Sequence, residues 1–342
     1  MPAAPALTII ADDLTGAQDT AAPFAARGAR VEVALRPSAI AAALAQRPDI
    51  LAVSTDSREI SAAEAARRVQ TVLAALPAGA RLFKKVDSRL KGNIAAELDA
   101  IPFDRALIAP AIAQFGRITQ GGCLRGFGVD TPIDIAAALG PVSARSDIPD
   151  VLTPQDMDTA LARTGADLLV GARGLGEALA ARMYPAPPQM VGTLPGPRLL
   201  AVIGSHDPIT LAQVETLATA GAARIVRAPN GQPGGPLDGD RVVLLATPGT
   251  DRRPADEVGA SLAAAVMAAA PADTLVLSGG ATAAVVLDRM GLTHLRLIGE
   301  CLPGLPVTVA GATTVVLKSG GFGDAATLLH LLGLIAQGKG SI

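Results

Sequence analysis

Residues 7–16 read LTIIADDLTG: an apolar run, two adjacent carboxylates (Asp12 and Asp13) and the start of a helical pattern. In an open α/β sheet, ligands bind beyond the carboxyl ends of the strands. Two carboxylates at such an end repel each other and lose water when the site is covered. The pair therefore favours a functional site, which could be a metal site, a general base or a partner for substrate hydroxyls. The alternative is that Asp13 only caps the helix that follows.

Apolar runs recur through the first half of the chain, at residues 31–35, 50–54, 81–86 and 106–109. Helical patterns lie between most of them, and the clearest runs from Ser61 to Leu76. There, Ser61 and Glu64 form a capping-box signature, and apolar residues repeat at helical spacing. Strands that alternate with helices predict right-handed βαβ units and a mostly parallel sheet. Pro23 is expected to kink or end the helix that follows Gly16.

A proline-rich segment divides the chain. Residues 184–198 read YPAPPQMVGTLPGPR, which is unsuited to a helix or a central strand. The alternation then resumes, with apolar runs at 199–203, 242–246, 274–278 and 314–317. We predict an α/β protein of two domains, each with a mostly parallel sheet flanked by helices. The expected parts are an N-terminal domain (1–184), a linker (185–198) and a C-terminal domain (199–342), with the active site in the cleft between the domains.

Composition excludes several classes of function. The chain has 342 residues, a net charge of -2, 2% aromatic residues and no tryptophan. It therefore lacks the basic surface and the stacking side chains that nucleic-acid binding requires. Cys123 and Cys301 are far apart, which predicts free thiols in a reducing compartment, and neither the cysteines nor the three histidines have metal-ligand spacing.

No segment of the sequence has the pattern of a signal peptide or a membrane span. Residues 1–8 carry no basic residue, and the apolar stretch at 258–270 is too short to cross a bilayer. We expect a soluble cytoplasmic protein without a membrane partner.

Four polar clusters follow the predicted strands of the N-terminal half, at 12–13, 54–58, 84–93 and 116–122. The carboxyl ends of parallel strands share one edge of a sheet, so these clusters are expected to converge there. Their mixture of carboxylates, hydroxyls, arginines and lysines suits a polyhydroxylated anion. For each cluster taken singly, the alternative is a solvated loop.

Glycine-rich turns mark the C-terminal half, at 202–208 (VIGSHDP), 275–282 (LVLSGGAT) and 318–324 (KSGGFGD). Glycines let backbone amides approach an anion, and a helix N-terminus favours negative charge. The turns together predict a nucleotide-phosphate site, although there is no Walker A motif and turn geometry is the alternative for each.

Residues 168–176 (LLVGARGLG) have the wrong glycine spacing for a dinucleotide site, and no acidic residue stands where the ribose would need one. A tight strand-to-helix turn is the favoured interpretation there. An oxidoreductase that binds its cofactor at Gly171 is a minor alternative.

Taken together, these motifs resemble the four-carbon acid sugar kinase family, along nearly the whole chain. The matching stretches are IADDLTGA (10–17), DSR (56–58), KVDSRLKGN (85–93), APA with GRIT (109–119), GGAT (279–282) and KSGGFG (318–323). The resemblance implies an N-terminal domain that binds a four-carbon sugar acid and a C-terminal domain that binds ATP. Members of the family phosphorylate threonates, erythronates or 3-oxo-tetronates, usually at the terminal hydroxyl.

This resemblance gives the candidate residues their expected roles. Asp13 and Asp12 are the expected catalytic residues: Asp13 is expected to act as the general base, with Asp12 as the alternative, and Asp12 or Asp87 to bind the neighbouring hydroxyls. The expected substrate-binding residues are Arg58, Lys85, Asp87, Ser88, Lys91, Asn93 and Arg117. The expected ATP-binding residues are Ser205, Gly279, Gly280, Ala281, Thr282, Gly320 and Gly321. Mg²⁺ is expected to accompany ATP, with its protein ligands left open.

The chain departs from the family pattern in its shorter length, at Arg89, where Thr is common, and at residues 123–130 and 205–207. The last two segments keep one alternative open, a sugar-acid-binding regulatory protein that does not transfer phosphate. Assembly into a homo-oligomer is likewise left open.

Overall fold

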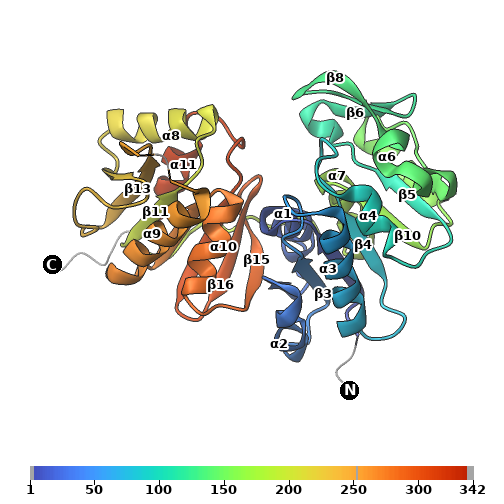
Figure 1. Cartoon of the computed structure of the whole chain (residues 1–342), viewed down its shortest axis with the longest axis horizontal. Coiled ribbons are helices and arrows are strands. Elements are labelled where there is room, and N and C mark those ends of the chain that lie inside the picture. Colours follow the sequence, from blue (N-terminus) through green and yellow to red (C-terminus); the bar gives the residue numbers. More distant parts are fainter. Residues whose placement is uncertain (1–3, 252, 337–342) are drawn as a thin grey trace. The chain divides into compact units, whose positions relative to one another are not determined.

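The computed structural model describes residues 4–251 and 253–336. It divides into two compact units, Met1–Pro188 and Gln189–Ile342. The boundary falls inside the segment that the sequence predicts to be a linker. Each unit contains its own series of neighbouring strands, β1 to β10 in unit 1 and β11 to β17 in unit 2 (Figure 1).

Unit 1 contains a parallel sheet whose strands are not in sequence order. The sheet order is β2(Val31–Ala34), β3(Ile50–Ser54), β1(Leu7–Ala11), β4(Leu82–Lys85), β10(Leu168–Gly171), β5(Ala106–Ala109) and β9(Ser146–Asp147). Neighbouring strands pair in parallel throughout. The five predicted strands of this half are therefore confirmed, and β1 lies between β3 and β4.

The helices of unit 1 connect and cover these strands. They are α1(Leu14–Ala25), α2(Ile40–Ala45), α3(Ala62–Ala75), α4(Ile94–Asp99), α5(Ile135–Leu139), α6(Pro154–Arg163) and α7(Arg173–Met183), with 3-10 turns at Pro37–Ala39, Ala113–Phe115 and Gly140–Arg145. The Ser61 hydroxyl caps α3 by accepting from the Glu64 amide at 3.3 Å. Helix α1 contains Pro23 in its last turn and continues to Ala25, so the proline does not end the helix at its own position.

A small antiparallel sheet was not predicted from the sequence. It consists of β6(Arg117–Gln120), β7(Cys123–Gly126) and β8(Val129–Asp134). Its turns contain Gly121, Gly122 and Gly128, all with positive φ. These glycines are the sequence feature that could have indicated the hairpins, because positive φ at such positions is typical of hairpin turns.

Unit 2 has five parallel strands followed by two antiparallel ones. The sheet order is β12(Arg224–Pro229), β13(Arg241–Thr247), β11(Leu199–Ile203), β14(Thr274–Ser278), β17(Thr313–Lys318), β16(Leu305–Ala310) and β15(His294–Leu302). β16 and β15 run antiparallel to their neighbours. The helices are α8(Pro208–Thr219), α9(Ala255–Ala268), α10(Gly280–Arg289) and α11(Thr327–Gly333). The predicted α/β class with mostly parallel sheets is thus confirmed in both units.

The later part of the proline-rich segment packs into unit 2. Met190 forms a β-bridge with Glu300, and Leu194 forms one with Ile335. Leu194 is buried in the apolar core of this unit. The residues after 188 therefore belong to the folded body of unit 2.

Within the described residues, no helix is both long enough and apolar enough to cross a membrane.

Candidate active site

Three neighbouring strands of unit 1 deliver the predicted N-terminal residues to one edge of the sheet. β3, β1 and β4 lie side by side, and their carboxyl ends lead to Arg58, Asp12 and Asp87 respectively. The convergence expected from the sequence holds for these three clusters. The fourth cluster, residues 116–122, contacts the others through Arg117, whose Nη1 donates to Ser88 Oγ at 2.6 Å.

Arg58 and Asp12 form a bidentate ion pair at the centre of this edge. Arg58 Nε donates to Asp12 Oδ2 at 2.7 Å, and Nη2 donates to Oδ1 at 2.9 Å. Burial of Asp12 would raise the pKa of its carboxyl, but the hydrogen bonds from Arg58 and the charges of Lys84 and Lys85 outweigh it and lower that pKa. Asp12 is therefore an ionised, fixed carboxylate.

Asp13 is both a helix cap and a member of this cluster. Its Oδ1 accepts from the Gly16 amide at 2.8 Å, and its Oδ2 accepts from Thr15 Oγ1 at 2.8 Å. Arg58 Nη1 lies 2.9 Å from the same Oδ2. The Asp13 side chain is 20% exposed, compared with 3% for Asp12. The capping role and the site role therefore coexist, and Asp13 is the more accessible carboxylate.

Lys85 ends β4 beside this carboxylate. Its side chain is buried, and its ammonium makes no hydrogen bond or ion pair with any described residue. A methyl group on Gly16 would stand 2.9 Å from Lys85 Nζ and would also collide with Asp13 Oδ1. The glycine therefore leaves room for the cation next to Asp13. A buried cation that makes no hydrogen bond or ion pair with the protein is suited to an anionic ligand.

The other predicted substrate residues differ in what they contact. Asp87 Oδ2 lies 4.0 Å from Arg58 Nη1, so three carboxylates surround this guanidinium. The Asn93 amide donates to the carbonyls of Ser57 and Ile60, at 2.8 and 2.9 Å, and so fastens the loop that carries Arg58. Lys91 is exposed.

Beneath this site lies a buried network that the sequence reasoning missed. Lys84 Nζ lies 3.0 Å from Glu97 Oε2, and both side chains are almost completely buried. Glu97 also accepts a short hydrogen bond from Ser57 Oγ, which in turn contacts Thr55 Oγ1 at 2.6 Å. Thr55 donates to the carbonyl of Ala11, so the network reaches the end of β1. The sequence feature that could have indicated this network is Lys84, a second lysine inside a buried strand.

The predicted ATP residues also converge, at the ends of three adjacent strands of unit 2. β11, β14 and β17 are neighbours, and the turns after them contain Ser205, Gly279 and Gly320. A side chain on Gly204 would collide with Thr282 Oγ1, and one on Gly320 would collide with Ser205 Oγ. Gly279 has φ of +103° and precedes α10, whose first amides have no side-chain cap. The contact at Gly204 and the positive φ of Gly279 favour glycine, and the uncapped amides at the start of α10 are available for an anion.

Within the described residues, no group of three or more His, Cys, Asp or Glu side chains could hold a metal ion. One carboxylate borders the glycine-rich turns: a methyl group on Gly321 would stand 3.1 Å from Asp207 Oδ2. The other oxygen of Asp207 accepts from the Ile209 amide at 2.9 Å. Asp207 therefore fits the usual Mg²⁺ arrangement, in which one or two carboxylates complete a shell of water and phosphate oxygens.

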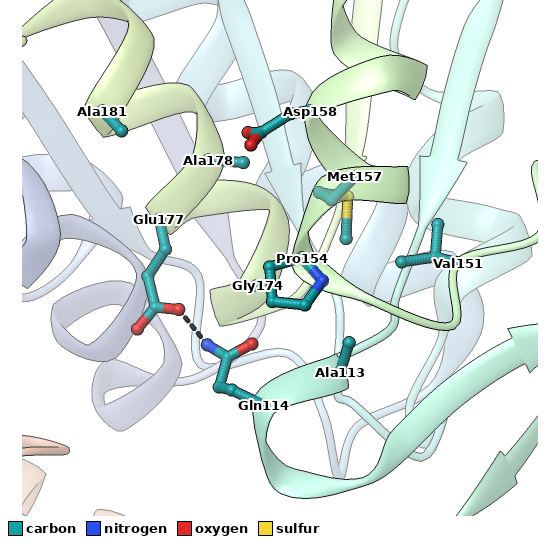
Figure 2. A pocket seen from close by; sticks show the side chains of 10 residues that line it. All are labelled: Ala113, Gln114, Val151, Pro154, Met157, Asp158, Gly174, Glu177, Ala178 and Ala181. Carbon is teal, nitrogen blue, oxygen red and sulfur yellow. Dashed lines mark hydrogen bonds between the residues drawn. The ribbon is translucent and has the colours of Figure 1, made fainter.

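A pocket of about 450 Å³ lies elsewhere in unit 1, between α6, α7 and the turn at Ala113–Phe115 (Figure 2). Gln114 and Glu177 are hydrogen-bonded at its wall. None of the candidate residues lines it. The candidate site is at the converging strand ends, where the charged groups gather.

The glycines of residues 168–176 allow close packing of the backbone against neighbouring residues. Side chains on Gly171 and Gly174 would collide with the carbonyls of Ala109 and Ala111. These contacts agree with the predicted tight turn between β10 and α7.

Comparison with known proteins relates the two units to characterised domains. A family model described as a sugar-binding N-terminal domain matches residues 7–182, and one described as a nucleotide-binding C-terminal domain matches residues 236–328. The chain is 30% identical to the D-threonate kinase of Cupriavidus necator, over 94% of this chain and 96% of the relative. It is also 30% identical to the D-threonate kinase of Bordetella bronchiseptica, over 95% and 96%. The 3-oxo-tetronate kinase of Methylobacterium radiotolerans is 28% identical, over 94% and 97%.

Solved structures show the same fold. A Salmonella typhimurium protein superposes with a TM-score of 0.73 at 19% identity, covering 95% of this chain and 98% of its own. A Haemophilus influenzae protein gives 0.69 at 20% identity, covering 96% and 99%. With both domain models matched and relatives that align along nearly the whole chain, the protein belongs to the family of four-carbon acid sugar kinases.

Proposed function

We propose that this protein is an ATP-dependent kinase that phosphorylates the terminal hydroxyl of a four-carbon sugar acid. The relatives are named for D-threonate and 3-oxo-tetronate, which defines the substrate class. The observation that supports the proposal is the proximity of Lys85, a buried cation with no hydrogen bond or ion pair among the described residues, to the accessible carboxylate of Asp13. Such a pair can hold an acidic, hydroxylated molecule by both of its characteristic groups.

Asp13 is proposed to receive the proton of the attacking hydroxyl. Both oxygens of Asp12 are held by Arg58, and its side chain is buried, so it is less able to meet a substrate. Arg58 also contacts Asp13 and therefore fixes the two carboxylates relative to each other. A positioned general base of this kind contributes about 10²- to 10⁴-fold to rate.

Lys85 is proposed to bind the carboxylate of the sugar acid, with Arg117 as a second cation. Arg117 donates from Nη1 to Ser88 Oγ and from Nε to the Phe127 carbonyl at 3.0 Å, which leaves Nη2 for a ligand. Arg58 has carboxylates on three of its nitrogens, so its predicted contact with the substrate stays a prediction. Asp87, Ser88, Lys91 and Asn93 likewise remain predicted contacts for the sugar acid.

ATP is proposed to bind at the glycine-rich turns of unit 2, with its Mg²⁺ contacted by Asp207. Mg²⁺ enters as part of the MgATP substrate and neutralises charge on the phosphates. Positioning and charge neutralisation supply most of the catalysis in phosphoryl transfer. Transfer requires the two sites to face each other, so the expected location between the domains remains part of this proposal.

The proposal is tested by the steady-state kinetics of Asp13→Asn. The change keeps the size of the side chain and removes the base, so kcat should fall by about 10²-fold or more while the protein stays folded. Asp99→Asn is the matched control, because Asp99 is an exposed carboxylate at the end of α4. Turnover near the wild-type value in Asp13→Asn would refute the assignment of the base.

A further inference from the structure

Lys318 is a buried cation that the proposed mechanism does not use. It ends β17, and its side chain is fully buried. Its Nζ donates to Ser319 O at 2.9 Å, to Thr210 Oγ1 at 2.9 Å and to Gly320 O at 3.1 Å. Burial lowers the pKa of Lys318 to about 8, although the charge of Asp207 opposes the shift. Burying an ammonium that only neutral oxygens contact costs free energy. This cost suggests that Lys318 has a role in the loop whose carbonyls it binds.

The carbonyl oxygens of this loop are bound from the side of α8. Thr210 Oγ1 donates to Gly320 O at 2.5 Å. Gln213 Nε2 donates to Phe322 O at 3.0 Å and to Asp324 O at 2.8 Å. Together with Lys318, these side chains tie the loop's carbonyl groups to the protein interior.

The same bonds fix where the loop's amides point. In a planar trans peptide, the C=O of one residue and the N–H of the next point in opposite directions. With the carbonyls of Ser319 and Gly320 held by Lys318, the amides of Gly320 and Gly321 face the other way. Within the described part of the chain, these amides donate to no protein acceptor. The N-terminus of α10 adds further uncapped amides across Gly279, whose own amide donates to Lys318 O at 3.2 Å.

We propose that Lys318 is a positioning residue for the phosphate chain of ATP: by drawing the carbonyls of Ser319 and Gly320 inward, it turns the amides of Gly320 and Gly321 toward the phosphates. Adjacent outward amides beside a helix N-terminus form an anion site. The inference rests on the proposed function of unit 2 and deepens it, because it assigns this loop to the phosphates and not to the nucleoside. Lys318 itself does not touch the nucleotide.

The test compares Lys318→Met with the wild-type chain by calorimetric titration of MgATP and of adenosine. Methionine keeps the length and apolar stem of the side chain and removes the ammonium. MgATP affinity should fall at least tenfold, adenosine affinity should change less than threefold, and KM for the sugar acid should stay unchanged. Arg227→Met is the control for charge, since Arg227 is exposed on β12 of the same unit, and it should bind MgATP like the wild type.

Thr210→Val provides a second test that retains the buried lysine. It removes one acceptor of Lys318 and one donor to Gly320 O, so a smaller loss, again confined to MgATP, is expected. Equal losses for MgATP and adenosine in folded variants, or unchanged MgATP binding in Lys318→Met, would overturn the inference. A wild-type chain that binds neither ligand would instead overturn the proposed function.

Discussion

Lys84→Met tests whether the buried ion pair under the carboxylate cluster supports unit 1. The exposed fractions of the Lys84 and Glu97 side chains are 0% and 1%, so solvent does not screen their interaction. Removal of the lysine leaves Glu97 as an uncompensated buried acid and leaves Lys85 O without its 2.9 Å donor. Breaking a buried pair in this way costs about 3–5 kcal/mol. For a unit of 188 residues, that loss corresponds to a fall of about 6–20 °C in melting temperature.

The measurement is differential scanning calorimetry of the wild type, Lys84→Met and the double variant Lys84→Met/Glu97→Gln. Glutamine removes the orphaned charge and keeps an acceptor for Ser57, so the double variant should recover at least half of the loss. Arg105→Met is the control, because the Arg105–Asp147 pair is exposed and its loss should leave the melting temperature nearly unchanged. A single variant that melts within 2 °C of the wild type, or a double variant less stable than the single one, would refute the reasoning.

Three further predictions concern other parts of the chain. Gly204→Ala places a methyl group against Thr282 Oγ1, so MgATP affinity should fall about tenfold or more in a titration, or about 1.4 kcal/mol. Burial raises the pKa of the Cys301 thiol to about 12, so at pH 8 a disulfide reagent should modify only one of the two cysteines until the protein is denatured. The pKa of Asp12 is lowered in the folded state, so its ion pair with Arg58 stabilises the protein above the unfolded pKa near 3.8. That contribution is lost as pH falls further, so the stability difference between the wild type and Asp12→Asn should shrink below pH 4.

These predictions have their own controls and contrary results. Gly235→Ala adds a methyl group with nothing within 4 Å and should bind MgATP normally. A Gly204→Ala variant with wild-type affinity would contradict the close approach of the turns. Rapid labelling of both thiols in the native protein would contradict the burial of Cys301. A stability difference for Asp12→Asn that grows toward acid pH would contradict the sign of the Asp12 shift.

The parts of the site that follow a strand could be predicted from the sequence. Asp12 and Asp13 stand at the end of a short apolar run, and the geometry of a parallel sheet places such ends together. The same reasoning located Arg58, although the sequence cannot show that its guanidinium forms a bidentate ion pair with Asp12. Which partner a charged group selects depends on side-chain distances that only the folded chain defines.

The two buried lysines of β4 show more clearly what the sequence cannot predict. Lys84 and Lys85 are adjacent, so their side chains point to opposite faces of β4. Lys84 forms an ion pair with Glu97, whereas Lys85 makes no hydrogen bond or ion pair among the described residues, and nothing in the dipeptide distinguishes the two. The antiparallel strands β6, β7 and β8 were missed for a related reason. They are short and half-exposed, so their apolar periodicity is weak and only their turn glycines mark them.

The central claim is phosphoryl transfer from ATP to a four-carbon sugar acid, and ADP release measured with purified protein tests it most directly. The assay supplies MgATP with D-threonate, L-threonate, D-erythronate or a 3-oxo-tetronate, each in a separate reaction. We predict release that depends on one or more of these acids, follows saturation kinetics and is lost in Asp13→Asn but retained in Asp99→Asn. ADP release no greater than the acid-free background with every one of these acids would contradict the account.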